Sequence, residues 1–471
     1  MITDRRIRRA LGIVLLLTIS LTAHAQTFSE KKEVAIFRLN YYGAPHDPPR
    51  SATVVQFGNV LRLERRVDSN TTDIFREAVG AVDEHIRSVF INLGRFDVIG
   101  LTHRLDAENV SSFIDVLSTY REQSAQLPET VLLGQEAFTE ADFNRISKGF
   151  IVVIPSVSYY NLELDEGEYN ATIETSFTFI NVQDLTTEGQ FFIETSGQDE
   201  NAREAMKSAV DGIPAELSYQ LRSMDIFKLR TGVIEVAGRE AVLEFGKNMG
   251  IKRGDEYAIV QSRVTSTGHQ TNEETGLLLI KEVREQYSVA QVLYANPPAL
   301  VGDQLEEVPR YGIEGGVYTQ VLTDPEFRRP TFILGLRGVA SRGFYTVRPL
   351  GGIEIPFTGT ILGLLFPINI YGGAEANWYM GRLKLNPSFS IGLGGGIPID
   401  KDLFAEDFYL THFGGTVKMT LSYLVSRDTL IYADLGYGQW FGIYNGIIPD
   451  EVTRFFNGYG GILIGAGVTL K

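Results

Sequence analysis

Eight charged residues in the last third of the sequence could form a network of buried ion pairs. Each lies in a segment where apolar residues alternate with polar or small ones, always on the polar side of the alternation. Because successive side chains of a strand point to opposite faces, all eight would share one face of a sheet. Four are acids and four are bases: Glu314, Glu354, Glu375, Asp434, Arg337, Arg348, Lys384 and Lys418.

The segments that carry these charges read as eight antiparallel strands within residues 311–471. One such segment is a weak signal, whereas eight in succession indicate a transmembrane β-barrel. The apolar face must meet lipid, because a charge at the bilayer midplane costs about 2–4 kcal/mol. An eight-stranded barrel is just wide enough for side chains to fill it. Since buried charges must be paired, we predict a salt-bridged, closed lumen. A soluble β-sandwich would also have short alternating strands, but it would not keep charge on one face of nearly every strand.

The connections between the predicted strands alternate in length. Every second one is a tight turn, at 341–343, 381–382 and 426–428, and the others are longer. Outer-membrane barrels have short periplasmic turns and longer external loops, so this order places the preceding domains in the periplasm. The pattern resembles the small OmpA/OmpX-like barrels, although the chain ends in Leu470-Lys471 instead of the terminal Phe common in proteobacterial members.

The N-terminus predicts export. A basic stretch with Arg5 and Arg9 precedes an apolar run at 11–21 and the motif Ala23-His24-Ala25, which together indicate a signal peptide over residues 1–25. After Gln26 no run of 18 apolar residues occurs that could form a spanning helix. The net charge of −15 argues against nucleic acid as a partner, because that would require a basic face.

Residues 26–225 read as an α/β domain. We expect strands at 32–42, about 51–63, 95–99, 150–164, 168–182 and 190–196, and helices at about 72–93, 105–121, 140–148 and 201–224. A helix leading into LGRFDVIG, and a later strand ending in FINVQDLTTEGQ, resemble the periplasmic domain of the CsgG and TolB-N-like families. The resemblance implies a periplasmic domain that binds other proteins.

Residues 226–309 read as a small β module. Alternating segments are separated by two Gly-Asp turns, at 254–255 and 302–303, which suit a compact barrel-like fold. The module resembles the C-terminal domain of FlgT-type flagellar accessory proteins. It contains the integrin-type tripeptide Arg253-Gly254-Asp255, which we interpret as a β-turn, since Gly and Asp favour turns.

The sequence contains none of the usual catalytic or metal-binding motifs. A P-loop, HExxH, GxSxG and an EF-hand are absent, and the lack of Cys excludes disulfides and thiolate sites. We interpret the scattered histidines as surface or loop residues, among them His46, His103, His269 and His412. Acids near the expected external rim could imitate an enzyme site, but they read as solvated loop charges: Asp400, Asp402 and Asp407.

These patterns predict a multidomain protein: an α/β periplasmic domain, a small β module and a C-terminal eight-stranded antiparallel transmembrane β-barrel. We expect a non-enzymatic outer-membrane protein without cofactors. Its barrel would sit in outer-membrane lipid, and its periplasmic domains would bind envelope or secretion proteins. The alternatives are a barrel enzyme that acts at the outer leaflet and an oligomeric CsgG-like secretion pore.

Overall fold

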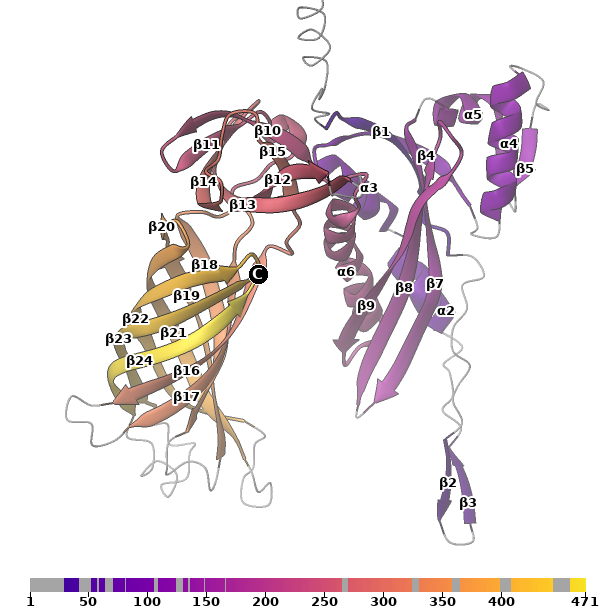
Figure 1. Ribbon diagram of the computed structural model, residues 1–471. Helices are drawn as coiled ribbons and strands as arrows, with labels where there is room; N and C mark the ends of the chain where they lie inside the picture. The colour runs from indigo at the N-terminus through magenta and orange to yellow at the C-terminus, as the bar shows by residue number, and fades with distance from the viewer. Residues whose placement is uncertain are drawn as a thin grey trace, which may run out of the picture.

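The computed structural model describes residues 29–41, 52–56, 59–63, 71–80, 82–105, 109–123, 130–133, 136–147, 149–165, 167–264, 270–323, 330–357, 365–398, 408–443 and 458–471. The predicted signal peptide lies outside the described residues, as do His46, His269, Asp400, Asp402 and Asp407. The protein is mostly β, with one mixed sheet covered by helices and two barrels (Figure 1).

The first unit, which we call the α/β domain, is built on a five-stranded sheet in the order β4-β1-β7-β8-β9. β1 is parallel to β4 and β7, and the remaining neighbours are antiparallel. The strands are β1 (Lys32–Arg38), β4 (Phe96–Arg104), β7 (Ile151–Asp165), β8 (Glu168–Asn181) and β9 (Thr187–Asp199). The helices are α2 (Thr71–Val79), α3 (Val82–Asn92), α4 (Val110–Gln123), α5 (Glu140–Ser147) and α6 (Ala202–Ser223).

Helix α6 covers one face of the sheet at β8 and β9. Its apolar residues recur at helical spacing and are buried, among them Ala205, Ile213 and Leu221. The Asn201 side chain accepts a hydrogen bond from the Arg203 amide and caps the helix N-terminus. Gly197 of β9 allows close approach, because a Cβ there would lie 2.2 Å from the carbonyl oxygen of Ala205.

Two local predictions in this domain were incomplete, and one pair of strands was missed. The helix expected at 72–93 is two helices, α2 and α3, with Gly80 between them. The strand expected near 51–63 is a hairpin of β2 (Ala52–Gln56) and β3 (Asn59–Leu63). A second hairpin, β5 (Thr130–Leu133) and β6 (Glu136–Thr139), was not expected. Isolated strands this short carry too little alternation to be recognised in a sequence.

The second unit is a closed barrel of six strands in the order β10-β11-β14-β13-β12-β15, which we call the small barrel. Its elements are β10 (Arg230–Ala237), β11 (Glu240–Leu243), η2 (Lys247–Met249), β12 (Glu256–Val264), β13 (Gln270–Val283), β14 (Ser288–Ala295) and β15 (Gln304–Val308). The tripeptide Arg253-Gly254-Asp255 lies in a turn before β12, where Gly254 has a φ of +79° and Asp255 is buried.

The third unit is the predicted eight-stranded antiparallel barrel, which we call the large barrel. Pairing of β16 with β24 and of β19 with β21 closes it, and the short β20 extends the ladder beside β21. Its strands are β16 (Ile313–Thr323), β17 (Thr331–Ala340), β18 (Val347–Phe357), β19 (Leu365–Ala376), β20 (Trp378–Met380), β21 (Leu383–Pro398), β22 (Tyr409–Ser426), β23 (Thr429–Gly442) and β24 (Tyr459–Leu470).

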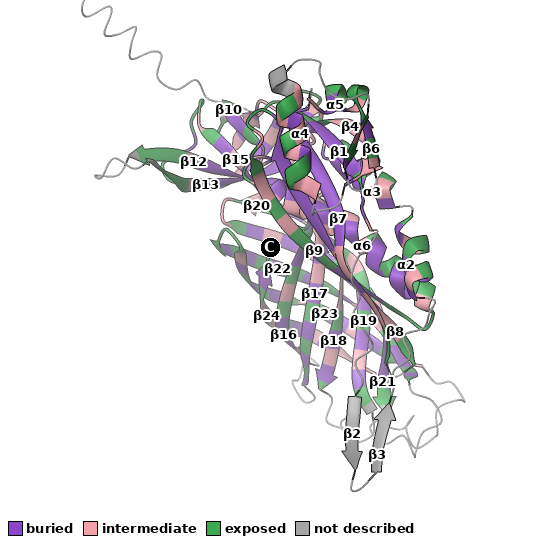
Figure 2. Cartoon of the chain, turned by 90° about the vertical axis from the view of Figure 1, so that its right-hand side faces the viewer, coloured by how far each residue is buried: buried purple, intermediate pink, exposed green. Residues whose placement is uncertain are grey.

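The short turns of the large barrel all meet the small barrel. The Gly343 amide donates to the Arg253 carbonyl, Arg382 lies over the Tyr294 ring, and Arg427 pairs with Glu274. The α/β domain lies to one side, and its long strands β7, β8 and β9 extend along much of the height of the large barrel in both views (Figures 1 and 2).

Candidate functional site

The large barrel has its apolar residues outside and its charged residues inside. On β16, Val317 is 53% exposed, whereas Glu314 is only 7% exposed. On β18, Val347 is 56% exposed and its neighbour Arg348 only 3%. Strand alternation produces this arrangement, because adjacent side chains point to opposite faces of the barrel wall. The distribution is the reverse of a soluble protein, in which large apolar side chains lie inside.

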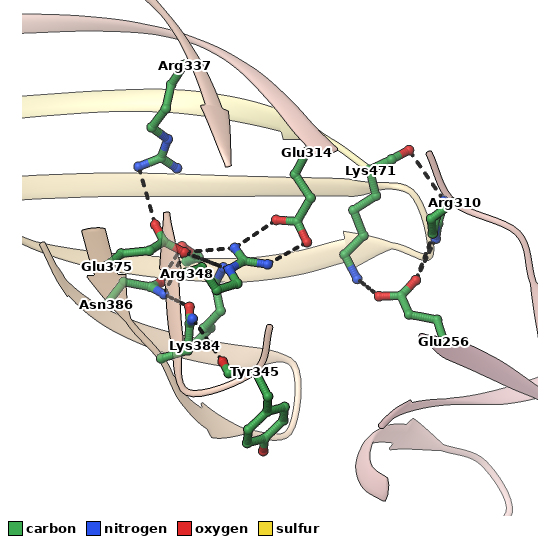
Figure 3. A network of polar contacts seen from close by, with 12 residues as sticks. Glu256, Arg310, Glu314, Arg337, Tyr345, Arg348, Glu375, Lys384, Asn386 and Lys471 are labelled. Atoms are coloured by element: carbon green, nitrogen blue, oxygen red, sulfur yellow. Dashed lines mark hydrogen bonds and ion pairs between the residues drawn. The ribbon is translucent and has the colours of Figure 1, made fainter. Parts of the chain in front are cut away.

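Arg348 is the centre of the ion pairs in the lumen. Its Nη1 lies 2.7 Å from Glu314 Oε1, and its Nη2 lies 2.8 Å from Glu375 Oε1 (Figure 3). Lys384 and Arg337 also approach Glu375, at 3.8 Å and 4.0 Å. All five side chains are buried, so each charge depends on the others for compensation.

A second polar cluster lies further along the lumen. Lys418 Nζ lies 3.7 Å from Asp434 Oδ2, and Gln320 donates to the same oxygen at 3.0 Å. Glu354 accepts a hydrogen bond of 2.7 Å from the Tyr318 hydroxyl, and Lys418 lies over the Tyr318 ring. The structure therefore brings seven of the eight predicted residues into ion pairs and gives Glu354 a tyrosine partner.

The lumen also contains apolar layers, which the sequence analysis did not anticipate. One layer is formed by Tyr318, Val339, Leu350, Tyr371 and Tyr432. Another lies toward the long-loop end and is formed by Leu322, Ile333, Trp440 and Leu463. Charged and apolar side chains thus alternate within the described part of the lumen. The sequence contained a signal for these layers. Each of these residues lies an even number of positions from a polar lumen residue on the same strand and therefore points to the same face.

The interpretation of His412 as a surface or loop residue was wrong. His412 is 1% exposed and lies in the lumen, where a bulge in β22 shifts the register against β21. Its Nε2 lies 2.7 Å from Asn369 Oδ1, and its Nδ1 lies 2.7 Å from Thr411 Oγ1. Gly394 leaves room for the ring, since a Cβ there would lie 2.0 Å from His412 Nε2.

A second group of charged residues, four of them buried, joins the three units, and no sequence pattern pointed to it. Glu307 of the small barrel accepts hydrogen bonds from Arg95 and Arg222 of the α/β domain, with Arg222 Nε at 2.6 Å from Glu307 Oε1. Arg222 also lies 3.3 Å from Asp255, which in turn pairs at 2.8 Å with Arg342 of the large barrel. We call these five residues the junction cluster.

The electrostatics of the junction cluster favour its charged forms. Burial alone would raise the pKa of Glu307, but the guanidinium groups of Arg95 and Arg222 lower the pKa to about 2. Burial opposes the charge of both arginines, yet Glu307 raises the pKa of each. Tyr257 lies beside the cluster, and burial raises its pKa well above the ordinary value.

Contacts with Glu256 of the small barrel also hold Lys471, next to the junction cluster. Arg310, in the link between the two barrels, contacts Glu256 at 2.8 Å and Asp428 at 2.6 Å. Glu256 also accepts a hydrogen bond from Lys471, the last residue (Figure 3). These contacts and the junction cluster form ion pairs and hydrogen bonds whose evident role is structural.

No group of three or more His, Cys, Asp or Glu side chains in the described ranges could hold a metal ion. Within the same ranges, no helix is long and apolar enough to cross a membrane.

No protein-family model and no curated protein matches the sequence. Among solved structures, the chain is similar to the Neisserial surface protein A, with 13% identity over 34% of this chain and 95% of that one and a TM-score of 0.25. It is also similar to OmpT of Vibrio cholerae (9% identity, 68% and 95% covered, TM-score 0.15) and to TolB of Acinetobacter baumannii (8% identity, 95% of each chain covered, TM-score 0.16). The resemblance of the first two units to CsgG and FlgT-type domains stays a prediction.

Proposed function

We propose that this protein is a non-enzymatic outer-membrane protein whose large barrel anchors the α/β domain and the small barrel in the periplasm. There the two units would bind other envelope or secretion proteins. The observation that carries the proposal is the inverted distribution of side chains in the large barrel. An exposed apolar wall around a lumen of ion pairs is stable in lipid, whereas in water it would be a large aggregation-prone surface.

The buried side chains in the lumen support an anchor in preference to a secretion pore. Arg348, Glu375 and their partners occupy one level of the barrel, and the apolar layers occupy others. A conducting path would require these buried groups to separate, at the cost of leaving charges unpaired.

Membrane extraction and crosslinking together test the proposal. Carbonate washing of cell envelopes should leave the protein in the membrane fraction, and unheated samples should migrate differently from heated ones on gels. Crosslinking in intact cells should then connect the α/β domain to periplasmic proteins. Release by carbonate would contradict the membrane anchor, and large steady conductance in planar bilayers would contradict the closed lumen.

A charge on the outer wall should destabilise the inserted barrel. Leu334 is 40% exposed on β17, near the middle of the strand. Leu334→Arg is expected to lower the free energy of unfolding in lipid vesicles by about 2–4 kcal/mol, because the guanidinium would face the bilayer midplane. Ile234→Arg, at an exposed position of the small barrel, should change it by less than about 0.5 kcal/mol. Equal effects of the two substitutions would contradict a lipid-facing wall.

The position of the α/β domain leads to a prediction about domain movement. Helix α6 exposes charged residues such as Arg203 and Lys207, which require water, yet the domain extends beside the large barrel (Figure 1). A bilayer around the barrel would occupy the same space. We therefore expect the α/β domain to turn away from the barrel wall when the barrel inserts, with the Asp255–Arg342 contact separating and the pairs of Arg95 and Arg222 with Glu307 kept.

Spin labels can measure this movement, because the chain contains no Cys. Labels at Lys207→Cys on α6 and Pro330→Cys near the long-loop end of the large barrel should lie farther apart in vesicles than they do in the structure. A control pair within the α/β domain, Lys207→Cys and Glu163→Cys, should keep its distance. An unchanged distance for the first pair would mean that lipid does not surround the barrel on that side.

A further inference from the structure

The α/β domain has an unprotected sheet edge at β9. β9 is the last strand in the sheet order and pairs only with β8 among the described strands. It is 13 residues long, and one of its two edges therefore presents a row of backbone amides and carbonyls without a strand partner. Figure 2 shows exposed residues along this strand.

Two of the usual devices that block edge pairing, lysine and proline, are missing from β9, and its three charged residues are all acids. Its register against β8 is regular apart from one shift near its first residues. The opposite edge of the sheet differs, since β4 is shorter and its Gly100 carbonyl accepts a hydrogen bond from Arg145. A long, regular edge without such protection is a template for an added strand.

The side chains beside this edge indicate which residue types an added strand would need. Phe192 is 55% exposed near the middle of β9. Glu194 stands directly opposite Glu174 of β8, and like charges in that position destabilise a sheet. The strands β7, β8 and β9 contain no Lys or Arg, but they contain seven acids: Glu163, Asp165, Glu168, Glu174, Glu188, Glu194 and Asp199.

We propose that β9 accepts an extended segment of a partner protein as an added strand, and that this segment carries Lys or Arg together with an apolar residue. The basic side chains would compensate Glu194 and Glu174, and the apolar one would cover Phe192. A second copy of this chain fits poorly, because its own β9 contains no Lys or Arg that could compensate the acids. The inference rests on the proposed protein-binding role of the α/β domain.

A synthetic peptide that repeats Lys-Thr-Val-Thr tests the surface on the full-length protein in detergent, because residues two apart lie on one face of a strand and can meet Glu194 and Phe192 together. Fluorescence anisotropy should show binding of this lysine peptide and little binding of a glutamate peptide that repeats Glu-Thr-Val-Thr. Methylating alternate backbone nitrogens of the lysine peptide should abolish binding, since it removes hydrogen-bond donors without changing the protein. Equal binding of the methylated peptide, or of the glutamate peptide, would overturn the proposal.

Two variants localise the binding. Glu194→Lys should weaken binding of the lysine peptide by at least about fivefold, whereas the same change at the exposed Glu285 of the small barrel should leave it unchanged. Equal losses for both variants would indicate attraction by net charge alone and overturn the assignment to β9. Crosslinks from the α/β domain to periplasmic proteins that avoid Phe192 would also overturn it, while leaving the proposed function intact.

Discussion

Replacing Arg348 with methionine is expected to lower the free energy of unfolding of the large barrel by about 3–5 kcal/mol. Arg348 is 3% exposed and holds both Glu314 and Glu375 at hydrogen-bond distance. Its removal leaves Glu314 buried without its ion-pair partner, and Glu375 would retain only the longer contacts to Lys384 and Arg337. Urea unfolding in detergent can be followed by the fluorescence of the two tryptophans, both of which lie in this barrel.

Two variants separate this effect from a general sensitivity to losing an arginine. Arg203 forms an exposed ion pair with Glu77 on the α/β domain, and Arg203→Met should cost less than about 1 kcal/mol. In the double variant Arg348→Met/Glu314→Gln, neutralising the acid should recover part of the loss. A cost below about 1 kcal/mol for Arg348→Met would mean that water reaches the pair and that the lumen is open.

The large barrel was predictable because its information is local. A period of two assigns each side chain to one face, so Leu334 and Leu336 on the outside predict Gly335 and Arg337 on the inside. The same rule placed the eight charged residues on the lumen face before their ion-pair partners were known. It could not identify partners, because Arg348 meets Glu314 and Glu375 through strand register and barrel closure, and both are properties of the whole barrel.

His412 and the junction cluster were missed for different reasons. His412 lies an even number of positions before Lys418 on β22 and therefore faces the lumen, but β22 begins at Tyr409, earlier than the segment in which the alternation was recognised. The junction cluster joins Arg95 and Arg222 of the α/β domain to Glu307 of the small barrel, and the three residues share no motif. Contacts between separately folded units leave no periodic signal in a sequence, so the structure was needed to find them.

The junction cluster should make the docking of the α/β domain sensitive to acid. Glu307 has its pKa lowered to about 2 by the two guanidinium groups, against the effect of burial. In the unfolded chain the carboxyl would titrate near its ordinary value of about 4.5. The contribution of the Glu307 carboxylate to the free energy of unfolding is therefore complete above about pH 4.5, and it is lost as the pH falls toward 2. The shift corresponds to about 3 kcal/mol, and Glu307→Gln should remove this pH dependence and a similar amount of stability at neutral pH.

The helices report on this contribution, because all the described α-helices lie in the α/β domain. Urea unfolding of the full chain, followed by helical circular dichroism between about pH 3 and pH 7, should show stability falling on the acid side in the wild type more steeply than in Glu307→Gln. The neighbouring Glu306 pairs with Lys228 and Arg230 but is partly exposed. Glu306→Gln should therefore cost less than about 1 kcal/mol and keep the acid dependence of the wild type. If Glu306→Gln and Glu307→Gln gave the same pH profile, the buried arginines would not hold Glu307 in its charged form, and the α/β domain would be docked by its apolar contacts alone.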